Sequence, residues 1–361
     1  MIHYQFSNSS ADLAAWDTFL QSHPRGLYNQ YSDWVQSYAS YGFRTGFVFL
    51  KDGDMLVGGA GYVVAQFSFF KFMVVPCGPV LLPGYEMEID PCIQKLHQKA
   101  KETGCCYFQI SLPLCKEHNA QDIFSLHSLP PSSFFYQGKE GTRFKFVIPL
   151  YGMRPIALQE PTFAGIRKGY SKNHLRNVVK GEKFGLQFRW ITNEEQQLLA
   201  AAYTCFEQNA KDKGYPIRSF DAIGDTLTTY LAKGLARVGV CFLGKTLVGA
   251  LYVMECGGRY IYINGGVFKE HQDKGVSHFM HDWVIREAHQ KGHLHYDISV
   301  GGSAGVVRFK EGFGSRLIAF ESPRYWVLNR PVFALYRLFE KSLKKHKRYV
   351  AKFLYLLKKK K

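Results

Sequence analysis

The sequence has no apolar run long enough to span a lipid bilayer, and its first residues lack the basic flank and apolar stretch of a secretory signal peptide. Its eight cysteines include no Cys-x-x-Cys pair, and most lie among apolar neighbours, where a free thiol packs as a small hydrophobic group. These absences argue against a disulfide framework and against a zinc site. We therefore expect a cytoplasmic protein with reduced, buried cysteines.

Positive charge, in contrast, is plentiful. The formal net charge is +17, and residues 341–361 contain ten basic and no acidic side chains, which leaves +7 for the rest of the chain. Apolar residues such as Leu343, Phe353 and Leu357 are interleaved with these lysines. The pattern predicts a basic amphipathic tail at 331–361 that binds an anionic membrane surface or RNA, which would place the protein peripherally at the inner face of the membrane.

The length of 361 residues exceeds what one hydrophobic core usually organises, so we expect two domains, at 1–155 and 156–330. Apolar periodicity and turn residues give the elements of the first domain. We expect helices at 12–20, 31–38 and 90–103 and strands at 45–51, 55–64, 71–75 and 106–111.

The second half repeats this order of elements. We expect helices at 162–184, 193–211, 220–233 and 274–291 and strands at 186–191, 238–243, 246–255, 259–264 and 295–299. Each half reads helix, helix, hairpin strands, helix and strand. This order fits a mixed α/β (α+β) layer, in which helices flank a mostly antiparallel sheet.

The most specific pattern is Tyr296-Asp297, then Gly301-Gly302, then the run from Arg308 to Gly314, which reads Arg-Phe-Lys-Glu-Gly-Phe-Gly. This stretch resembles the Fem-type (FemABX) transferases, which build peptidoglycan interpeptide bridges, and the wider Fem-like acyltransferases of the GNAT superfamily. The resemblance implies two tandem GNAT-like domains with the active site in the second. It also implies that an aminoacyl group passes from a charged tRNA to an amine on a lipid-linked precursor.

The resemblance extends to other segments between residues 10 and 325. Pro76 to Val80 is similar to the family's Pro-x-Gly-Pro motif. The segment from Ser171 to Asn177 is similar to its basic inter-domain helix, and Gly214-Tyr215 with Arg218 is similar to its Arg-x-Gly-Phe-x-x-Arg region. In two places the chain departs from the family. The position after Trp34 where a lysine is usual reads Val-Gln-Ser-Tyr38, and two extra residues separate Asp297 from Gly301. These departures leave the acceptor open.

Acyl transfer to an amine needs a neutral nucleophile, a positioned carbonyl and a group that stabilises the oxyanion. Lys310 is the candidate cation for the oxyanion or the acyl donor, since packing does not require a lysine between glycines and aromatics. Asp297 could orient the amine or cap the following turn. His295, close to it in sequence, is a candidate general base.

Other residues of the same motifs are candidates for substrate binding. The glycines would allow close approach of a ligand or a positive φ. The candidates are Tyr38, Arg218, Tyr296, Gly301, Gly302, Arg308, Phe309, Phe313 and Gly314.

A second donor remains open, because Gln272, Gly275 and Ser277, with Gly266 before them, partly match the turn on which GNAT enzymes hold the acyl-CoA pyrophosphate. The donor is then aminoacyl-tRNA or acyl-CoA. The basic helix from Arg167 to Lys183 suits a phosphate backbone and hence tRNA, although a solvated helix face would look the same. A third alternative is a transferase relative that only binds RNA or membrane.

Six histidines gather in one region: His271, His278, His281, His289, His293 and His295. His278 and His281 share a helix face, but no acidic or cysteine partner has the spacing of a metal ligand. We therefore expect no metal site.

Overall fold

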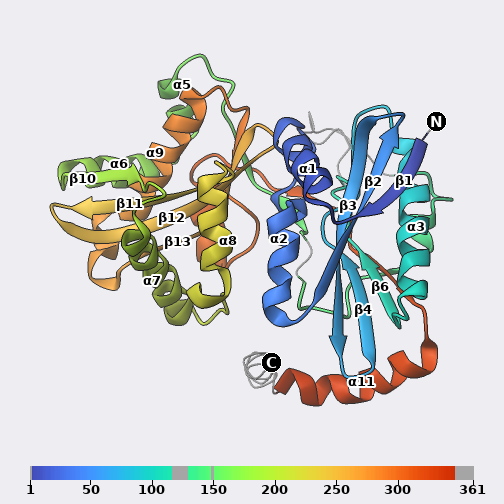
Figure 1. Cartoon of the computed structure of the whole chain (residues 1–361). Helices are drawn as coiled ribbons and strands as arrows, with labels where there is room; N and C mark the ends of the chain where they lie inside the picture. Colours follow the sequence, from blue (N-terminus) through green and yellow to red (C-terminus); the bar gives the residue numbers. More distant parts are fainter. Residues whose placement is uncertain (1, 116–128, 148–149, 346–361) are drawn as a thin grey trace. The chain divides into compact units, whose positions relative to one another are not determined.

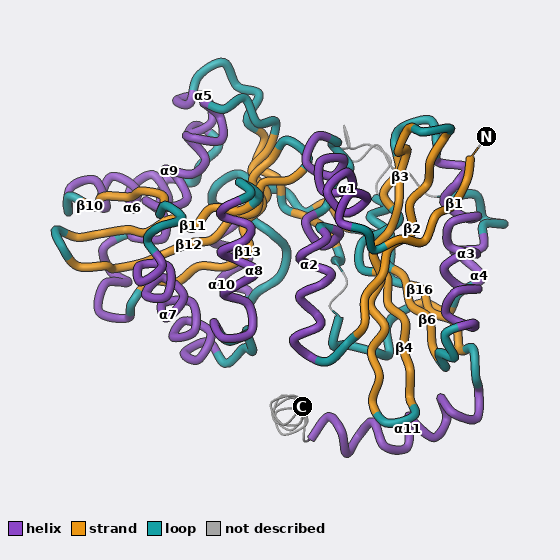
Figure 2. The backbone as a smooth tube through the Cα atoms, in the orientation of Figure 1, coloured by secondary structure: helices purple, strands orange, loops and turns teal. Residues whose placement is uncertain are grey.

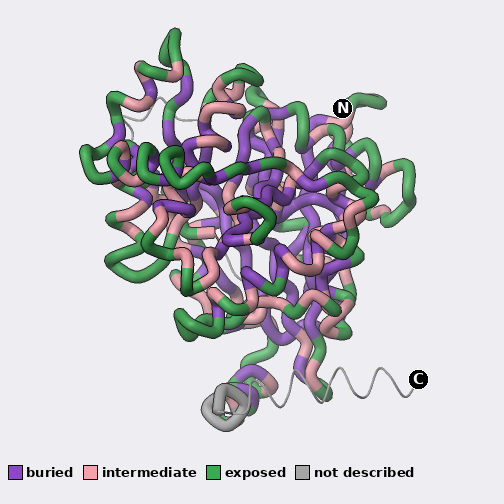
Figure 3. The backbone as a smooth tube through the Cα atoms, turned by 90° about the vertical axis from the view of Figure 1, so that its left-hand side faces the viewer, coloured by how far each residue is buried: buried purple, intermediate pink, exposed green. Residues whose placement is uncertain are grey.

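The computed structural model describes residues 2–115, 129–147 and 150–345. These fall into two compact units, one made of the described residues within 1–151 and 319–345 and the other of 152–318 (Figure 1). Each unit is a mixed sheet with helices packed on it, which confirms the predicted fold class (Figure 2). The central strands are the buried part of each unit, and exposed residues gather on turns and outer helix faces (Figure 3).

The first unit contains an eight-stranded sheet in the order β1-β2-β3-β4-β6-β16-β7, with β5 paired to β3. Its neighbours are antiparallel except for β4 and β6. The strands are β1 (Ile2–Ser7), β2 (Arg44–Asp52), β3 (Met55–Phe67), β4 (Phe70–Val75), β5 (Val80–Leu81), β6 (Tyr107–Ile110), β7 (Lys139–Glu140) and β16 (Arg324–Val327). The helices are α1 (Ser10–Ser22), α2 (Ser32–Gln36), α3 (Ile89–Glu102), α4 (Phe134–Gln137) and α11 (Arg330–Lys345).

The second unit contains a six-stranded sheet in the order β10-β11-β12-β13-β14-β9, in which only β13 and β14 are parallel among the described pairs. The strands are β9 (Pro155–Ala157), β10 (Leu186–Trp190), β11 (Ala236–Leu243), β12 (Thr246–Cys256), β13 (Arg259–Val267) and β14 (His295–Asp297). The helices are α5 (Phe163–Lys168), α6 (Lys172–Lys183), α7 (Gln196–Lys213), α8 (Phe220–Ala232), α9 (Val276–Gln290) and α10 (Ala304–Glu311). The short strands β8 (Gly152–Met153) and β15 (Ile318–Ala319) lie where the chain passes between units.

Glycines let helices approach both faces of the second sheet. A Cβ on Gly249 of β12 would lie 2.9 Å from Val276 of α9, and a Cβ on Gly266 of β13 would lie 2.7 Å from the Cys205 carbonyl of α7. Gly266 pairs with Ala250, the neighbour of Gly249, so the two glycines point to opposite faces. Helices α7 and α9 therefore cover opposite faces of this sheet.

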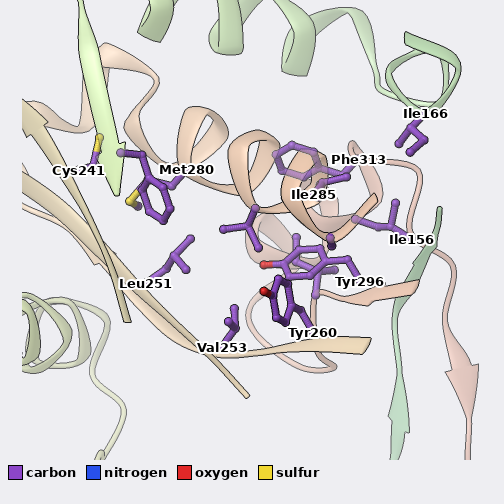
Figure 4. Close-up of a cluster of buried hydrophobic side chains, with 14 of the residues drawn as sticks. Ile156, Ile166, Cys241, Leu251, Val253, Tyr260, Met280, Ile285, Tyr296 and Phe313 are labelled. Carbon is purple, nitrogen blue, oxygen red and sulfur yellow. The ribbon is translucent and has the colours of Figure 1, made fainter. Parts of the chain in front are cut away.

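The core of the second unit lies between α9 and the sheet (Figure 4). Helix α9 buries Val276, Met280, Val284 and Ala288, which are spaced four residues apart and so lie along one face of the helix. Tyr296 of β14 is fully buried in the same cluster. This spacing explains why the sequence predicts α9 to within two residues at its start and one at its end.

Three segments differ from the sequence-based expectation. The expected helix at 162–184 is divided into α5 and α6, because Ser171 accepts a hydrogen bond from the His174 amide and starts a new helix. The motif run at 308–314, where no helix was expected, begins inside α10, which ends at Glu311. Strand β1 was not expected, and its residues pair with β2 at the edge of the sheet.

The domain boundary also differs from the expected residue 330. Strand β16 pairs with β6, so the segment from Ala319 onward belongs to the first unit. Of the predicted tail at 331–361, residues up to 345 lie in α11. Residues 346–361, which hold most of the predicted basic segment, lie outside the described residues.

Candidate active site

Lys310 is a buried lysine near the C-terminal end of α10, with 5% of its surface exposed. Its Nζ donates hydrogen bonds to the carbonyl oxygens of Ser299 at 3.0 Å and Gly301 at 3.1 Å, and to Ser299 Oγ at 3.4 Å. An ammonium has three N–H groups, so all three have partners. Burial lowers the pKa of Lys310 to about 8, while the negative charge of Asp297 opposes this shift.

The loop between β14 and α10 contains three residues of left-handed backbone. Ser299 has a φ of 61°, Gly301 of 92° and Gly302 of 112°. A serine in this region costs about 1 kcal/mol, so other contacts must hold it there. The two carbonyls that bind Lys310 belong to this loop, and Lys310 therefore fixes the loop's shape.

Asp297 ends β14 and is 5% exposed. Its Oδ1 accepts hydrogen bonds from the amides of Arg154 at 2.9 Å and Ser299 at 2.8 Å. Burial raises the pKa of Asp297, and the two amide hydrogen bonds oppose this rise. Of the two roles left open for Asp297, these contacts are those of a residue that caps the following turn.

Two buried arginines that sequence reasoning missed lie close to Asp297. Arg154 is 6% exposed and forms an ion pair of 3.2 Å with Glu311, and its charge also lowers the pKa of Lys310. Arg259, at the start of β13, is 1% exposed, and its charge acts to lower the pKa of Asp297. Arg154 lies between the short strands β8 and β9, and Arg259 follows a glycine pair, so no local pattern in the sequence marks either as buried.

Tyr296 was expected to contact substrate, but its side chain lies in the core. Its ring is fully buried, and its hydroxyl lies 2.8 Å from Nδ1 of His281 on α9. Burial is the main reason why the pKa of His281 falls to about 3, so this ring is neutral at physiological pH. The pair is a buried polar contact between β14 and α9, and we correct the expectation for Tyr296 accordingly.

Phe309 and Phe313 pack among three histidines. The ring centroids of His278 and Phe309 are 4.9 Å apart, those of His174 and Phe313 are 4.6 Å apart, and those of His281 and Phe309 are 5.5 Å apart. Burial lowers the pKa of His278 to about 4. The motif phenylalanines thus attach α10 to α6 and α9.

His174 makes a second attachment between α6 and α10. Its Nε2 lies 2.7 Å from the Phe309 carbonyl and its Nδ1 2.8 Å from Ser171 Oγ. A carbonyl only accepts, so the proton of the neutral ring is on Nε2 and Ser171 donates to Nδ1. A Cβ on Gly312 would overlap the His174 ring, which explains why a glycine stands there.

His295 was expected to act as a base beside Asp297. It is half-buried, and its Nε2 lies 3.5 Å from the side-chain amide nitrogen of Gln159. Burial and the nearby charges of Arg259 and Arg316 lower the pKa of His295 to about 4. Within the described part of the chain, no hydrogen bond joins His295 to Asp297, so the structure does not bring the two together as an acid–base pair.

The remaining candidates are spread over several places. Arg308, Gly301 and Gly302 are exposed, whereas Gly314 has a φ of 82° and lies against the Gly169 carbonyl. The other two candidates belong to other elements. Arg218 lies between α7 and α8, where its carbonyl accepts a hydrogen bond from the Tyr203 hydroxyl at 2.9 Å. Tyr38 belongs to the first unit, where it is 7% exposed.

The partial pyrophosphate turn has a packing role that the sequence did not indicate. Gln272 lies in a 3-10 helix, Lys269–Lys274, that precedes α9. Gly275 has a φ of 74°, and a Cβ there would overlap the Asn177 carbonyl of α6. Gly266 is packed against α7 in the same way. Both glycines are therefore required for packing, and Ser277, in the first turn of α9, is half-buried.

Within residues 2–115, 129–147 and 150–345, no group of three or more His, Cys, Asp or Glu side chains is arranged to hold a metal ion. In the same residues, no helix is both long enough and apolar enough to cross a membrane.

Comparison with known proteins supports a transferase fold. Residues 168–311, from the last residue of α5 to the end of α10, match a family model described as an acetyltransferase (GNAT) domain. No curated protein sequence matches the chain.

The matches to solved structures cover residues of both units. The crystal structure of FemX is 13% identical over 92% of this chain and 99% of that chain, with a TM-score of 0.73. A tandem GNAT protein from the clavulanic acid biosynthesis pathway is 9% identical over 91% of this chain and 99% of that chain, with a TM-score of 0.54. The C-terminal domain of a putative lysylphosphatidylglycerol synthetase from Agrobacterium fabrum is 10% identical over 88% and 92%, with a TM-score of 0.52. At these identities the likeness establishes the fold, and it confirms the tandem Fem-like GNAT architecture expected from the motifs.

Proposed function

We propose that this chain, an acyltransferase with a GNAT domain in its second unit and a Fem-like tandem fold, transfers an aminoacyl group to an amine of a cell-envelope precursor of the peptidoglycan type. The observation that carries the proposal is the buried Lys310 ammonium, held beside Asp297 by the loop 299–302 at the end of the matched domain. The nitrogen of the neutral acceptor amine attacks the ester carbonyl of the donor. A C–N amide bond forms, the ester C–O bond breaks, and the amine's proton goes to the departing hydroxyl oxygen.

Lys310 supplies a cation where negative charge develops on the carbonyl oxygen. Its two shorter hydrogen bonds go to backbone carbonyls and hold the loop, while the longest, at 3.4 Å, goes to Ser299 Oγ. This third N–H is the one that can exchange its partner for a substrate oxygen without releasing the loop. Because the pKa of Lys310 is about 8, the group is mostly protonated at neutral pH.

The proposed donor is aminoacyl-tRNA, supported by the two sides of α6. The inner side of α6 lies against Gly275 and covers the turn where a GNAT enzyme would hold a pyrophosphate. On the outer side, Lys172, Arg176 and Lys180 are exposed at intervals of four residues and so form one stripe. Such a stripe fits a phosphate backbone.

The decisive experiment is mass spectrometry of cell-envelope precursors from a deletion strain, complemented with wild-type protein, Lys310→Met or Lys245→Met. Lys245 is exposed in the β11–β12 turn and serves as the matched control. We expect an amide-linked substituent that is lost on deletion, restored by wild type and Lys245→Met, and not restored by Lys310→Met. An unchanged precursor pool in the deletion strain would refute the proposed acceptor.

A second candidate is transfer from acyl-CoA to a small amine or amino sugar, which the acetyltransferase description of the matched domain favours. Calorimetric titration with acetyl-CoA and with a longer acyl-CoA separates the two donors. Saturable heat that disappears when Ser277→Trp fills the turn would support acyl-CoA. Absence of heat, together with binding of charged tRNA, would support the first candidate.

A further inference from the structure

We propose that the first unit docks on an anionic lipid bilayer through one apolar edge, formed by Phe69 of the β3–β4 turn and by Leu335 and Leu338 of α11. We call these three residues the docking edge. The inference concerns the first unit alone and does not depend on the transfer chemistry proposed for the second.

Helix α11 is fixed on the first unit by two buried aromatic residues. The Phe333 ring stacks on Tyr107 of β6 with centroids 5.4 Å apart, and the Tyr336 ring meets Phe72 of β4 edge-on at 4.7 Å. These contacts determine which side of the helix faces outward. On that side Leu335 is 38% exposed and Leu338 is 78% exposed.

The β3–β4 turn, which lies beside α11, carries a third exposed apolar side chain. Phe69 is 56% exposed, and its ring centroid is 4.2 Å from that of Phe70. Phe70 in turn contacts Tyr336 of α11 at 5.6 Å. Figures 1 and 2 show this turn beside α11. An exposed Phe and an exposed Leu on adjoining elements form an apolar edge that water solvates poorly.

The charge next to the docking edge identifies its occupant. Arg330 and Arg337 of α11 are exposed, and residues 341–361, which begin within this helix, hold ten basic and no acidic side chains. Exposed apolar side chains flanked by basic ones are the composition of a segment that lies in the interface of an anionic membrane. RNA would satisfy the charges but not Leu338 and Phe69. A second copy would bring like charges together.

The test uses the full-length chain and co-sedimentation with two kinds of vesicle, phosphatidylcholine alone and phosphatidylcholine mixed with phosphatidylglycerol. We expect binding to the mixed vesicles that weakens with added salt. Phe69→Ser and Leu338→Glu should each lower the apparent affinity by roughly tenfold, since each removes an inserted apolar side chain. Both positions are exposed, so circular dichroism should show unchanged folding.

Met87→Glu is the matched control. Met87 is 82% exposed, but its neighbour Tyr85 bonds Asp52 at the start of the β2–β3 turn. Strand β3 has 13 residues and leads from that turn to the one that holds Phe69, so the two sites are roughly 40 Å apart along the strand. Met87→Glu should therefore bind vesicles as wild type does.

Three results would overturn the proposal: unchanged vesicle binding by Leu338→Glu, equal binding to both kinds of vesicle, or no binding to either. A concentration-dependent dimer in sedimentation equilibrium that Leu338→Glu abolishes would assign the edge to a second copy instead. Loss of tRNA binding in Leu338→Glu with vesicle binding intact would assign it to RNA.

Discussion

The ammonium of Lys310 is bound by the carbonyl oxygen of Ser299, a residue whose φ of 61° puts it in the left-handed region. A buried cation and a strained backbone thus stabilise each other across eleven residues of sequence. The same lysine is the candidate for stabilising the transition state. Its two roles, holding the loop and supplying charge, can be separated by experiment.

Replacing Lys310 by Met removes both roles while keeping the length of the side chain. We expect the transfer rate to fall by about a hundredfold or more, since a preorganised charge at the oxyanion is lost. The two loop carbonyls also lose their partner, so the free energy of unfolding should fall by about 1–3 kcal/mol. Initial rates and urea unfolding, with Lys245→Met as control, measure these effects. A Lys310→Met protein with wild-type rates would exclude a catalytic Lys310.

The loop can be disturbed without touching Lys310. Gly302 has a φ of 112°, and a Cβ there would lie 2.5 Å from Val306. Gly302→Ala should therefore cost about 1–3 kcal/mol and lower the transfer rate. Gly305, three residues on in α10, has open space around a Cβ apart from Ser303 Oγ at 3.9 Å. Gly305→Ala should stabilise the protein by about 0.5–1 kcal/mol. If the two changes had equal effects on stability and rate, the positive φ and the close contact with Val306 would not constrain the loop at Gly302.

The pH dependence of transfer should report the proton on Lys310. The pKa of this lysine is about 8 in the folded chain, below its ordinary value of 10.5. If the charged form is needed, the rate falls as the pH rises through about 8. Lys310→Arg, which keeps its charge, should lose this descending limb even if its rate is lower. A descending limb that persists in Lys310→Arg would assign it to another group.

The histidines around Phe309 should make the fold sensitive to acid. Burial lowers the pKa of His281 to about 3 and that of His278 to about 4, below the ordinary value of 6.5. At a pH below 6.5 but above these folded-state pKa values, the two histidines bind protons in the unfolded chain and not in the folded chain. The free energy of unfolding therefore decreases as the pH falls from about 6.5 toward 4. For one histidine, a difference of one between its pKa in the folded and in the unfolded chain changes the free energy of unfolding by up to about 1.4 kcal/mol. Urea unfolding at pH 7 and pH 5 should show the loss, and His281→Phe should reduce it.

The sequence predicts those parts of the fold that depend on local patterns. The four-residue spacing along α9 and the Asp52-Gly53 turn between β2 and β3 indicate elements that the structure confirms. Strand β1 also has a local pattern, because Ile2, Tyr4 and Phe6 alternate with polar residues as in a half-buried strand, and the prediction overlooked it. Helix α10 was missed because Gly305 and Gly312 are more typical of a loop.

The site was only partly predictable for a related reason. Lys310 and Asp297 stand in a motif, so the sequence indicates them. Arg154 reaches Asp297 across 143 residues, and no local pattern carries that information. Tyr296 stands in the motif beside Asp297 and so looks like a site residue. In the structure, β14 pairs in parallel with β13, and the Tyr296 side chain is buried in the core. Such placements follow from the topology of the sheet.

The stripe on α6 offers the most direct test of the donor. Replacing both Lys172 and Lys180 by Gln should lower the affinity for aminoacyl-tRNA. A plot of the logarithm of the tRNA-binding constant against the logarithm of the salt concentration should also have a shallower slope. The slope should change by about 0.9 for each duplex phosphate that the protein no longer neutralises. The matched control is Lys211→Gln with Lys213→Gln, two exposed lysines at the end of α7 that remove the same charge from the same unit. Filter binding at several salt concentrations measures both. If the α7 pair weakens binding as much as the α6 pair, the attraction is a general effect of charge and α6 is not the tRNA surface.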